Sequence, residues 1–506
     1  MIKKKWDILL VSEEAPLQED YWGDFVRYVK SPIEELGGKW PAPHAQHLSI
    51  VALATYLRRH GFKPAAVDNI FRLASCAEKF RRILAEGVPV VGISTAMLME
   101  KAAVERIIDE IRAINPAATI ILGGATAERQ SEVRALGDIT VIGDGERALL
   151  EVLQALKSGR DLKGIANIYY RDGGRMRYTG SSSDMEINEI PPADWDLLDV
   201  RPSLFYAVEA SKGCRYKCAF CSYPQLGRQA LKKPELVVEE LLRNRDRYGT
   251  GVQWFSDSNL TSWPDHTQHL CELMIRRRLN VPWSGYVRID DIARNPGLAH
   301  KMREAGCVGF FSGIESGDDS VLRAMRKGYD AKTAREGVRI AKDAGLLVHA
   351  NFIIGFPGET EETVENTLEF IRKAQPQTAA FTVFWIPVNS DASVWTDKKQ
   401  WEIRGEGTRW THRTMDSEQA IAHLRRAMSV VVNEMPNTVI ADEYLIVELL
   451  GYGLKLEEAV SYSSALRDFH RAKNLGLDEL KGKAAGHILD AHRKIDRFLD
   501  RSCRAL

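Results

Sequence analysis

Short apolar runs alternate with amphipathic stretches through the first part of the chain. The apolar runs have the length of buried strands and lie at 6–11, 65–68, 89–94, 119–124 and 139–143. Helical spacing of apolar residues occupies the stretches between them at 48–59, 101–114 and 146–156. Strands and helices that alternate with right-handed crossovers predict an α/β fold built on a doubly wound parallel sheet.

Small and glycine-rich turns follow three of these runs. Ligands of open parallel sheets bind beyond the carboxyl ends of the strands, and glycine lets a ligand approach the backbone closely. The alternative is that these turns serve the fold alone. The residues expected in a ligand crevice are Ser94, Thr95, Gly123, Gly124, Thr126, Gly143, Asp144, Gly145 and Glu146.

The same alternation resumes after residue 204. Strands are predicted at 205–209, 252–256, 283–287, 308–312, 347–354 and 379–385. Helices are predicted at 234–248, 265–278, 298–305, 331–344 and 361–374. This pattern predicts a partial (β/α)6 barrel, in which catalytic groups gather at the carboxyl ends of the strands. The expected domains are 1–160, a linker with a hairpin at 161–201, the barrel at 202–387 and a mostly helical region at 388–506.

An aromatic stretch precedes the C-terminal helices. It contains Trp385, Trp395, Trp401, Trp410 and His412. These side chains either hold part of a small-molecule substrate or pack the closing segment of the barrel, and packing is the commoner role of such residues.

Composition narrows the functional classes. The 506 residues include 69 Lys and Arg against 69 Asp and Glu, so no net positive field favours a nucleic-acid partner. No stretch has the length of a membrane span, and the apolar run at the start is too short for a signal sequence. Four of the seven cysteines stand singly, which argues against a disulfide framework and favours a reducing cytoplasm.

The other three cysteines share one loop, Cys214-x3-Cys218-x2-Cys221. Thiolates select zinc, copper(I) or an iron–sulfur cluster. A structural zinc site normally closes with a fourth protein ligand, and neither a histidine nor a second cysteine pair lies within about twenty residues. The spacing therefore favours a metal centre with an open position; the alternatives are free buried cysteines or an accidental zinc loop.

With Phe220 before its last cysteine, this loop resembles the cluster loop of the radical S-adenosylmethionine (SAM) enzymes. The resemblance implies that Cys214, Cys218 and Cys221 bind a [4Fe-4S] cluster whose fourth iron holds SAM, and that reduction of the cluster yields a 5′-deoxyadenosyl radical. Segments 313–317 and 355–360 are similar to matching segments of that family. A carboxylate, a cation and polar groups suit SAM, and the residues expected to bind it are Phe220, Asp257, Arg288, Glu315, Ser316, Asn351 and Gly355.

The order of turns in the first domain resembles the N-terminal cobalamin-binding domain of one large radical SAM class. This implies that the nucleotide tail of cobalamin enters the crevice. The Asp-x-His-x-x-Gly signature is absent, and His44, His47 and His60 lie in other contexts, so no histidine ligand to cobalt is predicted.

Together the two resemblances imply a cobalamin-dependent radical SAM methyltransferase that methylates an unactivated carbon, or phosphorus, of a small molecule, such as a natural product. The resemblance to this family also implies an external electron donor, a flavodoxin- or ferredoxin-like protein. The alternatives are oxidation, cyclisation or ring rearrangement by the same domain pair, and a non-catalytic cobalamin or iron–sulfur protein. Only Cys76 precedes Cys214, which disfavours a methylthiotransferase with further cluster cysteines.

Overall fold

The protein forms two compact units, which are described separately. The computed structural model describes residues 5–13, 28, 30–38, 47–98, 100–182, 186–198, 204–221, 229–386, 397–442 and 444–504, without the side chains of 500–504. The first unit comprises 1–16, 46–201 and 226–230, and the second comprises 17–45, 202–225 and 231–506. The expected 161–201 linker thus belongs to the first unit, and the expected helical region belongs to the second.

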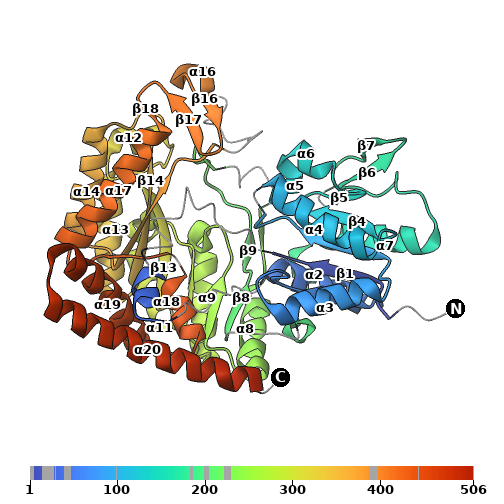
Figure 1. The fold of residues 1–506 in the computed structure, drawn as a ribbon, viewed down its shortest axis with the longest axis horizontal. Coiled ribbons are helices and arrows are strands. Elements are labelled where there is room, and N and C mark those ends of the chain that lie inside the picture. Colours follow the sequence, from blue (N-terminus) through green and yellow to red (C-terminus); the bar gives the residue numbers. More distant parts are fainter. Residues whose placement is uncertain are drawn as a thin grey trace. The chain divides into compact units, whose positions relative to one another are not determined.

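The first unit is built on one mixed sheet (Figure 1). Its strand order is β2 (Pro64–Val67), β1 (Ile8–Val11), β3 (Val90–Ser94), β4 (Thr119–Gly123), β5 (Ile139–Val141), β6 (Ile168–Asp172) and β7 (Arg175–Tyr178). Strands β1 to β5 are parallel, as predicted, whereas β6 and β7 are antiparallel. The hairpin expected in the linker therefore extends the sheet.

Amphipathic helices cover this sheet. They are α2 (Leu48–Arg59), α3 (Ala74–Ala85), α4 (Lys101–Ile114), α5 (Ala125–Arg129), α6 (Ser131–Arg134) and α7 (Gly145–Ser158). In α4 the buried residues Val104, Ile107 and Ile111 recur at helical spacing, which is the signal that predicted the helix.

Gly124 begins the turn from β4 into α5 and tolerates no side chain. Its φ is +103°, and an added Cβ would lie 2.8 Å from the backbone nitrogen of Ala96. We expect Gly124→Ala to lower the free energy of unfolding of this unit by more than about 1 kcal/mol. Gly159→Ala is the matched control, since Gly159 has a φ of +67° but nothing within 4 Å of the added Cβ. Equal losses in urea unfolding would contradict the role assigned to the close contact.

The second unit contains a partial parallel barrel made of two sheets. One sheet has the order β12 (Trp283–Gly285), β11 (Val252–Phe255) and β8 (Phe205–Val208), and the other has β13 (Gly309–Glu315), β14 (Leu347–Ile354), β15 (Thr378–Val383) and β19 (Val439–Ile440). Parallel bridges from Trp283 to Cys307 and from Tyr286 to Phe311 join the two sheets. The six predicted strands are present, and β19 adds a seventh from the C-terminal region, too short to be detected by periodicity.

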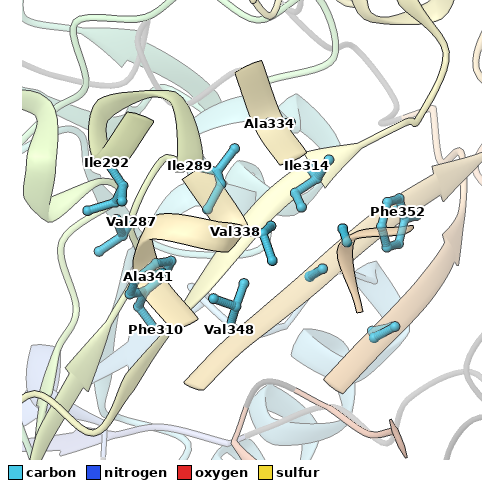
Figure 2. Close-up of a cluster of buried hydrophobic side chains, with 14 of the residues drawn as sticks. Val287, Ile289, Ile292, Phe310, Ile314, Ala334, Val338, Ala341, Val348 and Phe352 are labelled. Atoms are coloured by element: carbon cyan, nitrogen blue, oxygen red, sulfur yellow. The ribbon is translucent and has the colours of Figure 1, made fainter. Parts of the chain in front are cut away.

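Helices pack on the outside of the barrel strands. They are α8 (Pro234–Tyr248), α9 (Pro264–Arg276), α10 (Ile289–Arg294), α11 (Pro296–Glu304), α12 (Asp319–Ala324), α13 (Ala331–Asp343) and α14 (Glu361–Ala374). Figure 2 shows Val338 of α13 beside Ile314 of β13 and Val348 of β14. Side chains alternate between the two faces of a strand, so Glu315 of β13 and His349 and Asn351 of β14 face the barrel interior.

The C-terminal region adds a small sheet and a helical layer. Strands β16 (Arg404–Glu406), β17 (Arg409–His412) and β18 (Met415–Asp416) are antiparallel and follow α16 (Lys398–Trp401). The helices are α17 (Ser417–Glu434), α18 (Leu445–Gly451), α19 (Leu456–Leu475) and α20 (Asp478–Arg504), of which the last two run side by side (Figure 1). Among the described residues no helix is long and apolar enough to cross a membrane.

Candidate functional site

The cysteine loop is anchored at its start by the strand beside it. The loop leaves β9 (Ser211–Lys212), and the Asp257 carboxylate after β11 accepts hydrogen bonds from Ala210 N (3.0 Å) and Ser211 Oγ (2.5 Å). Complete burial raises the pKa of Asp257. Asp257, expected to contact SAM, is thus engaged with the base of the loop.

The three loop cysteines differ in exposure from two other cysteines of the same unit. Cys214, Cys218 and Cys221 are partly exposed, whereas Cys271 and Cys307 are buried in the core. Burial raises the pKa of Cys307 to about 12, which keeps it a thiol. In the described ranges no three His, Cys, Asp or Glu side chains converge as a metal site. The loop therefore supplies accessible soft donors, which a bound cluster would gather around itself.

Two buried cations lie beside Cys218. Arg288 Nη1 donates to Cys218 Sγ at 3.5 Å, and its Nη2 donates to the Lys327 carbonyl oxygen at 2.5 Å. Burial lowers the pKa of Arg288, but Asp290, 2.9 Å away, together with Tyr329 and Cys218, outweighs this effect and raises the pKa overall. Burial also lowers the pKa of Lys327, but Tyr329, Glu315 and Cys218 outweigh this effect and raise the pKa overall. Both side chains stay charged, and this setting suits thiolates that carry an anionic cluster.

Glu315 joins this group in a strained conformation. Its φ is +74°, a region that non-glycine residues rarely adopt. The carboxylate lies 3.6 Å from Lys327 Nζ and accepts a hydrogen bond of 3.1 Å from Asn351 Nδ2. Such strain persists where surrounding contacts hold it, and it clusters at functional sites. The structure thus brings Glu315, Asn351 and Arg288 together near Cys218, through the unpredicted Lys327.

Other expected SAM residues lie in the supporting layer. Ser316 is fully buried. Its Oγ lies 3.3 Å from Thr367 Oγ1 and accepts a hydrogen bond of 3.1 Å from Asp318 N. Phe220 packs edge-on against Phe356, with ring centroids 6.4 Å apart. Ser316 therefore ties β13 to α14, while Phe220 links the cysteine loop to the turn after β14.

That turn, residues 355–359, is held from two sides. The Glu359 carboxylate accepts a hydrogen bond from Gly355 N, and His412 Nε2 donates to Gly355 O at 2.9 Å. Gly355 has a φ of +90°, and a Cβ there would lie 2.6 Å from the Trp410 ring. Trp410 and His412 of the aromatic stretch thus pack on this turn, and Trp395 lies outside the described residues. Periodicity gave no sign of Glu359 or of the contact made by His412.

The buried carboxyl of Glu359 makes the stability of this turn depend on pH. Burial raises its pKa from 4.5 to about 8, so over this interval the folded chain holds a proton that the unfolded chain has released. The resulting stabilisation is complete below the lower value and declines as the pH rises to the upper one, at roughly 1 kcal/mol per pH unit.

Glu359→Gln keeps an acceptor for Gly355 N and is expected to flatten this decline. Urea unfolding of both proteins between about pH 5 and pH 8 measures the difference. A parallel decline in the variant would assign the pH dependence to other groups.

The expected crevice residues of the first unit do share one edge of its sheet. Thr95 Oγ1 donates to Gly123 O at 2.9 Å and accepts from Ala127 N at 3.0 Å, which ties β3 to β4 and α5. Gly143 N donates to Glu128 Oε2 at 3.3 Å. The remaining members lie at the end of β3, at the start of α5 or at the start of α7: Ser94, Gly124, Thr126, Asp144, Gly145 and Glu146.

A histidine–carboxylate pair lies after β1 and β2 and was missed by the sequence reasoning. The Asp68 carboxylate lies 2.6 Å from His47 Nδ1 and accepts a hydrogen bond of 2.7 Å from Ser12 Oγ. Burial raises the pKa of Asp68, but His47 and these hydrogen bonds outweigh it and hold the pKa below its usual value. The partners are 21 residues apart in the sequence, so no local motif reveals the pair.

Each of the two units contains a domain that matches a known protein family. The radical SAM superfamily model matches residues 208–371, and the B12 binding domain model matches residues 42–153. An uncharacterized methyltransferase of Pyrococcus horikoshii is 30% identical over 58% of this chain and 66% of its own length. The anaerobic magnesium-protoporphyrin IX monomethyl ester cyclase of Rubrivivax gelatinosus is 25% identical over 69% of this chain and 65% of its own. The chain thus spans slightly less than two thirds of either relative.

A solved structure has a similar fold. The radical SAM methyltransferase TsrM from Kitasatospora setae, with cobalamin and a [4Fe-4S] cluster bound, matches with a TM-score of 0.65 and 15% identity over 99% of this chain and all of that one. The two matched domains are those that bind a [4Fe-4S] cluster with SAM and cobalamin. The chain therefore combines a B12 binding domain with a radical SAM domain.

Proposed function

We propose that this chain is a cobalamin-dependent radical SAM methyltransferase acting on an unactivated carbon, or phosphorus, of a small molecule. The observation that carries the proposal is the group around Cys218, where a soft donor loop meets Arg288, Lys327 and Glu315. The name of the Pyrococcus horikoshii relative supports the transferase assignment.

Each residue of this group has a distinct role in the proposal. The thiolates of Cys214, Cys218 and Cys221 hold three irons, while Arg288 and Lys327 offset negative charge at Cys218. Glu315 and Asn351 present a carboxylate and an amide to the ammonium of SAM, and the turn at Gly355 supplies backbone polar groups. When bound, the cluster supplies the electron that cleaves SAM, and cobalamin carries the methyl group.

The crevice of the first unit is proposed to take cobalamin. Gly143 has open space where a Cβ would stand, so its backbone is accessible at the strand ends. Ser94, Gly123, Gly124, Thr126, Asp144, Gly145 and Glu146 lie at the same edge, where open parallel sheets bind ligands. Thr95 acts there by fixing the turn.

A second candidate is an oxidative cyclisation or ring rearrangement on the same cofactors. The cyclase of Rubrivivax gelatinosus favours it, since that relative is 25% identical over 69% of this chain. Both candidates need an electron donor, for which a flavodoxin- or ferredoxin-like protein is proposed. The outcomes differ in whether a methyl group from SAM reaches a product.

Anaerobic reconstitution tests the proposal. The full chain is loaded with iron, sulfide and cobalamin and then reduced in the presence of methyl-labelled SAM. We expect stoichiometric iron, cobalamin retained through gel filtration, deoxyadenosine formation and transfer of the label to cobalamin. Deoxyadenosine without retained cobalamin would overturn the role of the first unit, and loaded protein that forms no deoxyadenosine would overturn the enzyme assignment.

A further inference from the structure

A cavity of about 350 Å³ lies at the end of the barrel opposite to the cysteine loop. Its wall includes the first residues of three strands, Gly309 of β13, Leu347 of β14 and Thr378 of β15. Helices α18 and α19 contribute Ile446 and Ser463. Glu315 and Asn351 lie at or near the carboxyl ends of their strands, so the cavity is distinct from the proposed SAM site. Its volume falls in the range of about 300–1,000 Å³ found for small-molecule sites.

A layer of aromatic rings crosses the barrel interior above the cavity. The rings of Tyr286 and Phe311 meet edge to face at 5.0 Å, and Phe311 stacks on His349 at 5.0 Å. Trp254 meets Tyr286 at 5.1 Å. His349 stands two residues before Asn351 on the same face of β14, about 7 Å lower along the strand. The rings therefore separate the cavity from Glu315 and Asn351, which lie toward the other end of the barrel.

His349 lines the cavity, and the two nitrogens of its ring differ in their hydrogen bonding. Nδ1 lies 2.7 Å from Thr378 Oγ1. Nε2 is buried and has no hydrogen-bond partner within the described part of the chain. The residue is 8% exposed, and its burial lowers the pKa to about 3, so the ring is neutral. A buried polar group without a partner costs about 1–3 kcal/mol, which a hydrogen-bonding ligand would recover.

The charged groups of the cavity wall are already engaged. Arg467 pairs with Asp468 at 2.8 Å and also donates to Pro436 O. Asp442 accepts hydrogen bonds from the backbone nitrogens of Tyr444 (3.0 Å) and Leu445 (2.7 Å). Much of the rest of the wall is apolar, including Phe311, Ile446 and Val460. The wall therefore suits an uncharged occupant more than an ion.

We propose that this cavity binds a small neutral molecule with an apolar, aromatic-sized body and one polar group that hydrogen-bonds to Nε2 of His349. Its occupant is a second ligand, separate from substrate and cofactors. A primary amide fits either tautomer of the ring, because its carbonyl accepts from Nε2–H and its NH2 donates to an unprotonated Nε2.

Benzamide is the probe, and its binding to the full chain is measured by calorimetry. His349→Phe keeps the stacking on Phe311 but removes the ring nitrogens, and Val460→Trp fills the cavity from α19. We expect millimolar or tighter binding by the unaltered chain, at least about tenfold weaker binding by His349→Phe, and none by Val460→Trp or with benzoate. SAM cleavage by both variants should be unchanged.

Two results would overturn the proposal. One is the absence of benzamide binding by the unaltered chain. The other is benzamide binding by Val460→Trp or by His349→Phe that equals binding by the unaltered chain, because the first places the probe outside the cavity and the second shows that it makes no bond to Nε2 of His349. Neither result bears on the proposed methyltransferase, because the binding needs no cluster and no cobalamin.

Discussion

Replacing Cys218 by serine is expected to abolish SAM cleavage. Cys218 is the loop cysteine that Arg288 contacts, at 3.5 Å. A serine hydroxyl is a hard, protonated donor and does not replace a thiolate on iron. Changes that only touch the partners of metal ligands cost about 10–100-fold in affinity or activity, so loss of a ligand should exceed about 100-fold. Iron and sulfide content, the EPR signal of the reduced protein and deoxyadenosine formation measure the effect.

Cys271→Ala is the matched control for this substitution. Cys271 is fully buried in α9 of the same barrel, and burial raises its pKa so that it remains a thiol. Its removal should lower stability through a small cavity but leave the iron content unchanged. Equal iron loss in both variants would show that the barrel, rather than the ligand set, had been damaged.

Lys327→Met is expected to destabilise the second unit by about 3 kcal/mol, because removing one partner of a buried ion pair leaves the other charge uncompensated. The side chains of Lys327 and Glu315 are 4% and 8% exposed, with Nζ and Oε1 3.6 Å apart. Lys327 Nζ also donates to Gly313 O at 2.7 Å, and without it that oxygen would be left with the longer hydrogen bond of 3.3 Å from Tyr329 Oη. Urea unfolding of the full chain measures the loss.

Two further variants separate the ion pair from general damage at this position. Adding Glu315→Gln to Lys327→Met removes the unpaired charge and should restore at least about 1 kcal/mol. Arg326→Met changes the neighbouring cation, which is 51% exposed and pairs with Asp397, and should cost less than about 1 kcal/mol. If the double variant is no more stable than Lys327→Met, the pair with Glu315 is not the source of the loss.

The sequence by itself determined the architecture and the candidate chemistry. Apolar runs and helical spacing are local signals, so they located strands such as β4 and helices such as α4 and α14 nearly to the residue. The cysteine spacing is equally local, because one tight loop carries all three donors. Gly355, Glu315 and Asn351 could be expected because they lie at or near the ends of strands that the pattern had already placed.

Only the tertiary structure decided which of these residues lie in contact with one another. Lys327 reaches Glu315 from a turn after α12, and His412 reaches Gly355 across 57 positions, so no spacing rule links them. Asp257 and Ser316, which the sequence predicts as SAM-binding residues, hydrogen-bond to the base of the cysteine loop and to α14, because a buried polar side chain needs a hydrogen-bond partner. The hairpin at 168–178 and β19 joined sheets whose edges the sequence does not mark. Local pattern fixes elements, whereas long-range pairing and burial decide what each polar side chain contacts.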